Sequence, residues 1–358
     1  MSLLPQTMKA LTVQKGKGLK LDDVTIPTLG SNQVLIKVHS IAQNPTDWKH
    51  ADFVSPVDTI IGCDFSGVVV KLGSDSITEV KLGDAVAGFV HGGKDKDWGA
   101  FAQYVKADSN LVWKFSPSSL SFEEAATMNC ALWTGIQAFY HRMGLEEPSS
   151  ASQKNEWILI YGGSSSVGLF STQLAKLSGY KVITTTSPKN FGLLKSLGAD
   201  IVIDYKSPDL VGQIQNATGN SLKLAFDTIS EGNTTGTCVL ALAPAPEGTT
   251  PGKVEVVLLP SKEAKELRKD VLRMHTDTLL YTSLGRAFDW SGIHYPASAE
   301  DRAHMASWMP KLEALIATGK IKSNPIKLWP GGLEAVNDGF QYMREGKVSA
   351  EKIVYNVA

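Results

Sequence analysis

The stretch WILIYGGSSSVGLFSTQLAKLSGYKVITTTS occupies residues 157–187. Its first five residues are apolar and uncharged, as in a buried strand, and a turn rich in serine and glycine follows at 162–168. A helix is predicted next, because apolar residues recur at helical spacing: Val167, Phe170, Leu174 and Leu177. Gly179 is placed to end that helix as a left-handed cap, and a second strand follows. This order predicts the βαβ unit that places a dinucleotide pyrophosphate at a helix N-terminus.

The turn departs from the usual G-x-G-x-x-G pattern at one position. Gly163 and Gly168 keep the outer glycines, but Ser165 stands where the middle glycine normally lets the backbone approach the pyrophosphate. The hydroxyls of Ser164, Ser165 and Ser166 can donate to phosphate oxygens and so compensate. The turn alone leaves open an alternative, a Ser/Gly turn in an α/β protein of another kind.

The end of the second strand indicates which dinucleotide is bound. An NAD site usually carries Asp or Glu about 20 residues after the first glycine, whereas residues 184–187 contain no acid. Ser187 can cap the next helix with Pro188 as its first residue, and Lys189 and Asn190 beside that N-terminus suit a 2′-phosphate. The sequence therefore predicts NADPH. The alternative is that these residues only begin a helix and that Lys189 is a solvated charge.

Composition excludes several classes of protein. The 358 residues are 43% hydrophobic and 20% charged with a formal net charge of −1, so nothing indicates a nucleic-acid partner. No apolar run approaches the ~18 residues of a membrane span, and the first residues lack a secretory signal. Cys63, Cys130 and Cys238 have no paired spacing, which argues against a disulfide framework and a four-cysteine zinc site. A cytoplasmic protein is expected.

The order of predicted elements indicates two domains. Short strands between Gly, Pro and Asp turns predict a barrel-like region near the N-terminus, at 9–13, 33–38, 67–72, 83–88 and 99–105. A helix capped by Ser121 and a second over 132–143 precede five strand–helix alternations, which predict a parallel sheet with strands near 157, 181, 201, 223 and 254. The remainder predicts two helices and a last strand, at 305–317, 333–345 and 352–357.

This arrangement resembles the medium-chain dehydrogenase/reductase superfamily across nearly the whole chain. The segments that match are 44–47, 62–69, 83–86, 99–105, 162–168, 319–321, 346–347 and 352–354. The resemblance implies an α/β fold with a Rossmann doubly wound parallel sheet over 123–289. It also implies a β-rich GroES-like barrel domain, residues 1–122 plus 290–358, that is completed by the C-terminal tail.

Differences from the zinc-dependent members at two segments limit the resemblance to one branch of the superfamily. Zinc alcohol dehydrogenases carry Cys where Asn44 stands and Gly-His-Glu where 62–64 stand, and a catalytic zinc needs three ligands plus an open position. Cys63 and Asp64 alone do not supply that set. The chain is therefore most similar to the zinc-free quinone oxidoreductases and enoyl reductases. Residues 161–164, 186–191 and 204–205 are most similar to fungal stand-alone enoyl reductases that serve polyketide synthases.

The resemblance implies a set of cofactor contacts. The nicotinamide end of the cofactor is expected at Pro45, Thr46, Asp47 and Trp48, and the pyrophosphate at Ser164, Ser165, Ser166 and Val167. The 2′-phosphate and the adenine are expected at Ser187, Pro188, Lys189, Asn190 and Tyr205. The residues expected to cover the nicotinamide are Leu258, Leu259, Val348 and Ser349. For Leu258 and Leu259, an apolar strand end buried in the core is the alternative.

The implied chemistry is hydride transfer, without zinc, to the β-carbon of an enone or enoyl thioester. Charge then builds on the carbonyl oxygen, and a proton must reach the α-carbon. Lys49 is the first candidate donor and Thr134 the second, while Thr46 and Asp47 are expected to position the ribose or a water. Alternatively Lys49 is an ordinary surface lysine. Mitochondrial enoyl reductases carry a tyrosine soon after the turn that is predicted at 44–47. Residues 50–55 contain none here, so water is the alternative proton source.

The segment before Thr134 is expected to line an acyl pocket, with the protein core as the alternative: Met128, Asn129, Cys130, Ala131, Leu132 and Trp133. The function predicted is an NADPH-dependent reductase of an activated carbon–carbon double bond. The alternatives are an NADPH-dependent quinone oxidoreductase and a redox-silent, NADPH-binding partner protein. Expected partners are a small-molecule or acyl-thioester substrate and a polyketide synthase, with monomer and homodimer both open and no membrane or nucleic-acid partner.

Overall fold

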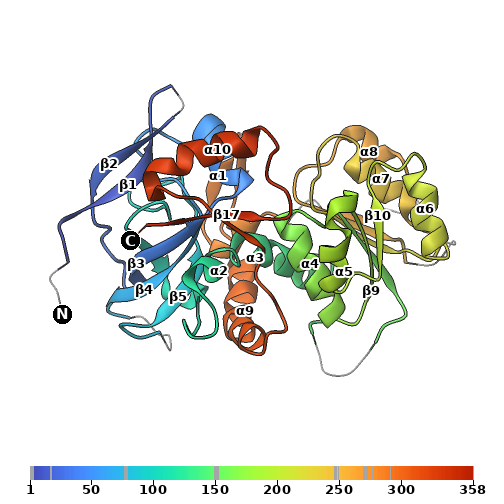
Figure 1. The fold of residues 1–358 in the computed structure, drawn as a ribbon, viewed down its shortest axis with the longest axis horizontal. Helices are drawn as coiled ribbons and strands as arrows, with labels where there is room; N and C mark the ends of the chain where they lie inside the picture. The colour runs from blue at the N-terminus through green and yellow to red at the C-terminus, as the bar shows by residue number, and fades with distance from the viewer. Residues whose placement is uncertain are drawn as a thin grey trace. The chain divides into compact units, whose positions relative to one another are not determined.

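The structure is a computed structural model that describes residues 4–16, 18–75, 80–148, 153–245, 248, 250–268, 273–275, 278–290 and 292–357. The chain forms two compact units, drawn in Figure 1: the first is Met1–Cys130 with Tyr281–Ala358, and the second is Ala131–Leu280. The division predicted from the sequence has its boundaries at 122/123 and 289/290.

The first unit is built on a seven-stranded sheet of order β16-β17-β3-β4-β5-β7, with β6 also paired to β3. Its strands are β3 (Gln33–Ala42), β4 (Asp64–Leu72), β5 (Ala85–Phe89), β6 (Tyr104–Asp108), β7 (Val112–Lys114), β16 (Ile326–Leu328) and β17 (Lys352–Asn356). Hairpins are formed by β1 (Thr7–Val13) with β2 (Leu19–Thr25) and by β14 (Phe288–Trp290) with β15 (Ile293–Tyr295). β17 lies antiparallel to β3 (Figure 1), which confirms that the C-terminal tail completes the first domain.

The predicted strand at 99–105 is wrong for most of its length, because β6 begins only at Tyr104. Gly99 packs against the backbone of Ile60 so closely that a Cβ atom would lie 2.2 Å from the Ile60 carbonyl oxygen. The loop that follows still hydrogen-bonds like a strand, since Phe101 N donates to Ile61 O at 3.0 Å. Tertiary contact therefore replaces regular pairing in this alternating segment.

The helices of the first unit are short except for one. They are α1 (Pro45–Lys49), the π-helix η1 (His50–Val54), α2 (Phe122–Ala126), α9 (Ala299–Ala317) and α10 (Val336–Arg344), with 3-10 turns η2 (Ser109–Leu111), η5 (Leu280–Leu284) and η6 (Gly332–Ala335). The cap predicted for α2 is confirmed, because Ser121 Oγ accepts from Glu124 N at 3.1 Å. α9 begins six residues before the predicted start at 305, where Ser298 Oγ accepts from Asp301 N. Within the described residues, no helix is long and apolar enough to cross a membrane.

The second unit contains a six-stranded parallel sheet of order β10-β9-β8-β11-β12-β13. Its strands are β8 (Trp157–Tyr161), β9 (Lys181–Thr186), β10 (Ile201–Asp204), β11 (Leu224–Asp227), β12 (Lys253–Val256) and β13 (Arg273–His275). The helices are α3 (Cys130–Ile136), whose first residue belongs to the first unit, η3 (Gln137–Arg142), α4 (Ser166–Leu177), η4 (Pro188–Asn190), α5 (Phe191–Ser196), α6 (Leu210–Ala217), α7 (Thr234–Ala241) and α8 (Lys262–Glu266). The five predicted strands are confirmed, and β13 is an additional one.

Strand order reverses between β8 and β11, so the carboxyl ends of these neighbours form the switch point where doubly wound sheets bind their ligands. Gly179, with φ of 84°, ends α4 in the left-handed conformation that the sequence predicts. β8 is buried along 158–161 and packs between two parallel neighbours, which explains its uncharged sequence.

A buried carboxylate holds three distant segments of the first unit together. Asp108 lies at the end of β6 with its side chain 4% exposed. Arg286 Nη2 donates to it at 2.7 and 3.0 Å, and Arg302 Nη1, on α9, donates at 2.6 Å. Burial raises the pKa of Asp108, but the charges and hydrogen bonds of the two arginines outweigh burial and hold that pKa below its usual range.

Replacing Asp108 with Asn should lower the free energy of unfolding at pH 7 by about 2–3 kcal/mol, because charge-assisted hydrogen bonds are lost. The folded-state pKa of Asp108 is depressed, so its contribution is present above the unfolded pKa of about 4 and is lost as the pH falls through the folded value. Urea unfolding at pH 7 and pH 3 measures both effects. Asp289→Asn is the control, since Asp289 forms an exposed pair with His294. An equal loss at both pH values would show that the Asp108 charge is not what stabilises the unit.

Candidate active site

The segment at 44–47, predicted as a turn, is the beginning of a helix. Asn44 has an extended backbone, Pro45 is the first residue of α1, and Asn44 N donates to Asp47 Oδ2 at 2.7 Å. A proline at the first position and an acid at the third are ordinary helix-start signals, so the sequence contained this information. The helix presents Thr46 and His50 to each other one turn apart, with Lys49 beside them and partly buried.

Asp47 is fully buried and caps α1 with its carboxylate. Its pKa is raised to about 7, mainly by burial and also by the nearby Asp64, while the Asn44 N–H, Cys63 and Lys352 act in the opposite direction. The carboxylate therefore lies inside the unit. Its expected role in positioning a ribose or water stays a prediction.

A buried lysine ammonium group contacts residues that align with the zinc ligands of zinc alcohol dehydrogenases. Lys352 Nζ, on β17, donates to Asp64 Oδ2 at 3.2 Å and also to Asn44 Oδ1. Asn44 Nδ2 donates to Asp64 Oδ2 at 2.8 Å, and Cys130 N donates to Asp64 Oδ1 at 2.7 Å. Lys352 and Asp64 are 2% and 0% exposed, so each charge depends on the other.

The donor set does not fit a catalytic zinc. Among the residues that the structure describes, no three His, Cys, Asp or Glu side chains are grouped to hold a metal ion. Cys63, at one of the ligand positions, is a buried thiol whose pKa is raised well above its usual value, mainly by burial and then by the neighbouring Asp47. Asp64, the other residue at a ligand position, is already bonded to Lys352 and Asn44.

Tyr281, which the sequence did not single out, contacts the site helix α1 from 235 residues away. Its hydroxyl lies 2.7 Å from Thr46 Oγ1 and 3.7 Å from Cys63 Sγ. The His91 ring stacks on the tyrosine ring, with centroids 4.0 Å apart and an interplanar angle of 30°. His50 Nδ1 lies 2.8 Å from the Thr46 carbonyl oxygen, and burial lowers the His50 pKa to about 4. Burial also raises the pKa of Tyr281 well above its usual value, so both side chains are neutral near pH 7.

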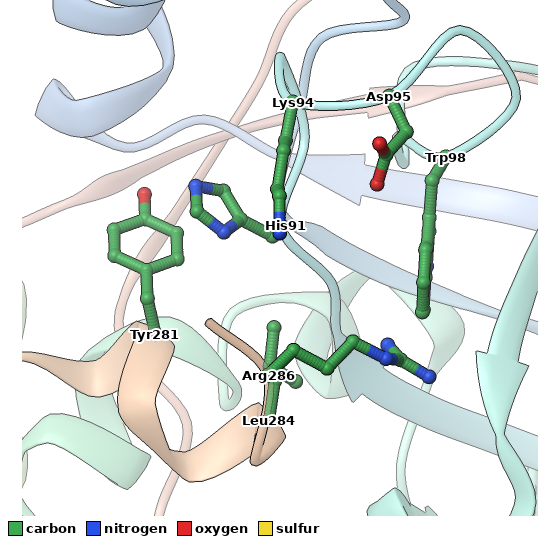
Figure 2. A pocket seen from close by; sticks show the side chains of 7 residues that line it. All are labelled: His91, Lys94, Asp95, Trp98, Tyr281, Leu284 and Arg286. Atoms are coloured by element: carbon green, nitrogen blue, oxygen red, sulfur yellow. The ribbon is translucent and has the colours of Figure 1, made fainter. Parts of the chain in front are cut away.

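A small pocket lies beside this tyrosine. It spans about 260 Å³, part of which is open to solvent, and is lined by His91, Lys94, Asp95, Trp98, Tyr281, Leu284 and Arg286. Figure 2 shows Tyr281 and His91 next to each other at one end, while Arg286 extends toward Trp98 at the other. The Arg286 guanidinium lies 3.9 Å from the Trp98 ring centroid.

In the second unit, the turn before α4 requires its outer glycines. A Cβ atom on Gly163 would lie 2.0 Å from Thr184 Oγ1, and one on Gly168 would lie 2.4 Å from the Gly162 carbonyl oxygen. The backbone of Ser165, with φ of −68° and ψ of 158°, is extended and needs no glycine. This explains why the middle position of the pattern accepts a serine.

The hydroxyl of Ser165 is used within the turn. It accepts from Gly168 N at 2.9 Å, which caps α4. Thr228 Oγ1 donates a hydrogen bond to the Tyr161 carbonyl oxygen at 2.8 Å. In the 2.8 Å contact between Ser165 and Thr228, Ser165 is therefore the donor. The predicted compensation by serine hydroxyls therefore concerns Ser164 and Ser166, which are partly exposed with Val167 at the N-terminus of a 12-residue helix.

The ends of β9 and β10 carry the residues expected to bind the 2′-phosphate and the adenine. Pro188 is the first residue of η4, as predicted, but the side chain of Ser187 before it makes no capping hydrogen bond to that turn. Lys189 is exposed, whereas Asn190 is buried with its amide 3.4 Å from Thr186 Oγ1. Tyr205 is 44% exposed, directly after β10. β8, β9 and β10 are parallel neighbours, so these residues share the carboxyl edge of the sheet with the turn at 162–168.

The other predicted residues divide between the two units. Leu258 and Leu259 follow β12 in the second unit and are 42% and 59% exposed, which excludes the alternative of a buried strand end. Val348 and Ser349 are partly buried, before β17 in the first unit. The segment that the sequence assigned either to an acyl pocket or to the core is mostly buried, Cys130 being intermediate: Met128, Asn129, Ala131, Leu132, Trp133 and Thr134.

Asn129 illustrates the core alternative for that segment. Its Oδ1 accepts from Trp113 Nε1 at 2.9 Å, and its Nδ2 donates to the Phe65 carbonyl oxygen at 3.1 Å. These bonds lie within the first unit and occupy both ends of the amide. They favour a structural role for Asn129, and the substrate contacts of its neighbours stay a prediction.

Known proteins match the chain along its length. Residues 30–117 match the alcohol dehydrogenase GroES-like domain, and residues 166–257 match the zinc-binding dehydrogenase family. A trans-enoyl reductase of Alternaria alternata is 39% identical over 98% of this chain and 99% of its own length. An enoyl reductase of Chaetomium globosum is 37% identical over 99% of this chain and 95% of its own.

Solved structures show the same fold. The quinone oxidoreductase from Coxiella burnetii is 26% identical, with a TM-score of 0.72 over 98% of this chain and 100% of its own. The CurK enoyl reductase, at 19% identity, has a TM-score of 0.75 over 99% of this chain and 100% of its own, a likeness of fold alone. Together with the identity to full-length enoyl reductases, these findings confirm the predicted resemblance. The chain therefore belongs to the trans-enoyl reductases of the medium-chain dehydrogenase/reductase superfamily.

Proposed function

We propose that the protein reduces the carbon–carbon double bond of an enoyl thioester with NADPH as the hydride donor and without zinc. The observation that carries the proposal is the Lys352–Asp64–Asn44 cluster, which places an ammonium group among the positions that hold a catalytic metal in zinc-dependent relatives. Reduction of a conjugated double bond needs donors for a developing enolate, which side chains can supply.

The second unit offers a suitable seat for NADPH. The outer glycines let the turn pack tightly against Thr184 and the Gly162 carbonyl group, and the N-terminus of α4 suits a pyrophosphate. β9 ends without an acid at Thr186, and exposed Lys189 follows, which supports recognition of a 2′-phosphate. When bound, the nicotinamide supplies the hydride. In this proposal Pro45 to Trp48, Leu258, Leu259, Val348 and Ser349 enclose that end of the cofactor.

The first unit supplies the polar groups for the reaction. Hydride reaches the β-carbon, the electron pair of the double bond moves toward the carbonyl oxygen, and a proton then joins the α-carbon. Lys49 follows Thr46 on α1 by three residues and its ammonium lies 5.7 Å from the Trp48 ring centroid. We assign it to stabilise the enolate and deliver the proton, with Thr134 as the second candidate.

A second candidate function is quinone reduction. It is supported by the similarity to the quinone oxidoreductase from Coxiella burnetii. In that reaction the protons go to oxygen, so a donor for the α-carbon is not required. The names of two curated relatives, both enoyl reductases, favour reduction of an enoyl group. In this proposal the acyl chain is carried as a thioester by a partner such as a polyketide synthase.

Metal analysis tests the proposal that the protein works without zinc. The purified protein should contain no stoichiometric zinc, and a chelator should leave turnover with an enoyl thioester unchanged, because the ligand positions are bonded to Lys352. Elemental analysis and an assay after dialysis against chelator measure this. One tightly held metal per chain, removed together with the activity, would contradict the proposal.

Cofactor choice depends on Lys189 in this proposal. Lys189→Ala should weaken NADPH binding about tenfold or more, since a charge-assisted contact with the phosphate is worth about 1.5–3 kcal/mol, and should leave NADH binding unchanged. Titration of both cofactors by tryptophan fluorescence measures this. Lys195→Ala on α5 is a matched control, because Lys195 is also exposed and lies on the adjoining helix. Equal affinity of the wild type for NADH and NADPH would show that the protein does not recognise the 2′-phosphate.

Lys49→Ala should lower kcat with an enoyl thioester by ~100- to 1000-fold, which is the usual cost of losing one donor to a developing oxyanion. NADPH affinity should change little, because the contact strengthens only in the transition state. Thr134→Ala should be milder. Lys96→Ala, an exposed lysine paired with Asp58, is the control. Wild-type turnover of the Lys49 variant would remove this residue from the mechanism and leave solvent as the proton source.

A further inference from the structure

Tyr281, which begins the second chain segment of the first unit, contacts the helix that precedes residues 50–55, a stretch without a tyrosine. Tyr281 is 4% exposed, and its hydroxyl lies 2.7 Å from Thr46 Oγ1. Thr46 is on α1, the helix expected to meet the nicotinamide end of the cofactor. The phenol therefore lies one hydrogen bond away from a group expected to touch the reactants.

Counting protons around Thr46 limits what its hydroxyl can do. His50 Nδ1 lies 2.8 Å from the Thr46 carbonyl oxygen, which can only accept, so Nδ1 carries the proton. That nitrogen then has no lone pair for the Thr46 hydroxyl, which lies 3.0 Å away. The Thr46 proton has two destinations left: the Tyr281 oxygen or a bound molecule.

We propose that Tyr281 is a positioning residue that donates to Thr46 Oγ1 and thereby leaves the Thr46 proton for an oxygen atom of the bound cofactor or substrate. This inference rests on the proposed function. In the resulting chain, Tyr281 donates to Thr46 and Thr46 donates to the reactant, and each bond polarises the next. When no reactant is bound, the same hydroxyls can reverse, with Thr46 donating to Tyr281 and the phenol turning to the Cys63 sulfur at 3.7 Å.

The position of Tyr281 is fixed by its own surroundings. Its ring is stacked on His91 and lies at an angle to Phe288, with centroids 5.9 Å apart. Two hydrogen bonds hold the segment that follows η5: Lys94 Nζ donates to the Ala287 carbonyl oxygen at 2.7 Å, and Arg286 donates to Asp108. A group held this firmly can keep a neighbouring hydroxyl in one orientation, as a positioning role requires.

A double-mutant cycle tests the inference on the full chain with NADPH and a short-chain enoyl thioester. Tyr281→Phe removes only the hydroxyl and should lower kcat about tenfold, since a small misplacement near the reacting atoms costs up to ~100-fold. The KM for NADPH should change less than about twofold. In a Thr46→Val background the same change should have no further effect on kcat, because Tyr281 acts only through Thr46. In a Thr46→Ser background, which restores the hydroxyl, Tyr281→Phe should again lower kcat.

Tyr355→Phe is the matched control, because it also removes a buried phenol hydroxyl in the first unit, one bonded to Gln43 Oε1 at 2.7 Å. It should leave kcat within about twofold of wild type, and melting temperatures of all variants separate folding from positioning. Unchanged kcat in Tyr281→Phe, or equal losses with and without the Thr46 hydroxyl, would overturn the inference while the enoyl reductase function stands. A wild-type protein that turns over no enoyl thioester would overturn both. If Tyr281→Phe does not fold, unchanged kcat in Thr46→Val would still overturn the inference, because Tyr281 is proposed to act only through the Thr46 hydroxyl.

Discussion

The buried ion pair between Lys352 and Asp64 is the interaction on which the first unit depends. Neither charge reaches solvent, and a buried charge without its partner costs several kcal/mol. The lysine comes from the last strand, the aspartate from β4, and Asn44 joins them one residue before α1. The pair thus ties the C-terminal tail to the barrel strands and sets the start of the helix that carries Thr46 and Lys49. Loss of either partner would leave the other charged group buried and uncompensated.

The same pair defines the chemical character of the site. A lysine ammonium is a fixed positive charge that is part of the chain, whereas a metal ion would bring open coordination positions for a substrate oxygen. With the ammonium already bonded to Asp64 and Asn44, the charge that develops in the proposed reaction has to be met by other donors. The hydroxyl and ammonium groups on α1 are the nearest candidates along the chain.

The second unit accommodates its departure from the usual phosphate-binding pattern by a change in local hydrogen bonding. Ser165 stands in an extended conformation that any residue can adopt, and its hydroxyl caps α4 and bonds to Thr228. The two glycines that remain are those against which Thr184 and the Gly162 carbonyl group pack. The turn therefore accepts a serine at position 165, where the backbone is extended, but keeps glycine at 163 and 168, where a side chain would clash.

The sequence by itself determined the features that local physics controls. The cap at Ser121 and the left-handed Gly179 depend on residues within one or two turns of each other. The βαβ unit and the parallel sheet follow from the order of strand-like and helix-like patterns along the chain. The capping signals at 44–47 were also present, although they were interpreted as a turn. The family resemblance added that the last strand joins the first domain, which β17 confirms.

Only the tertiary structure decided which distant side chains meet. Lys352 is 288 residues from Asp64, and Tyr281 is 235 residues from Thr46, so no periodicity or spacing could pair them. The alternating segment at 99–105 is mostly a loop for the same kind of reason, since the close approach of Gly99 to Ile60 outweighs its strand-like pattern. Burial decided the rest, because whether a carboxylate such as Asp47 or Asp108 faces water or a partner depends on packing from all sides, and a linear sequence does not contain that packing explicitly.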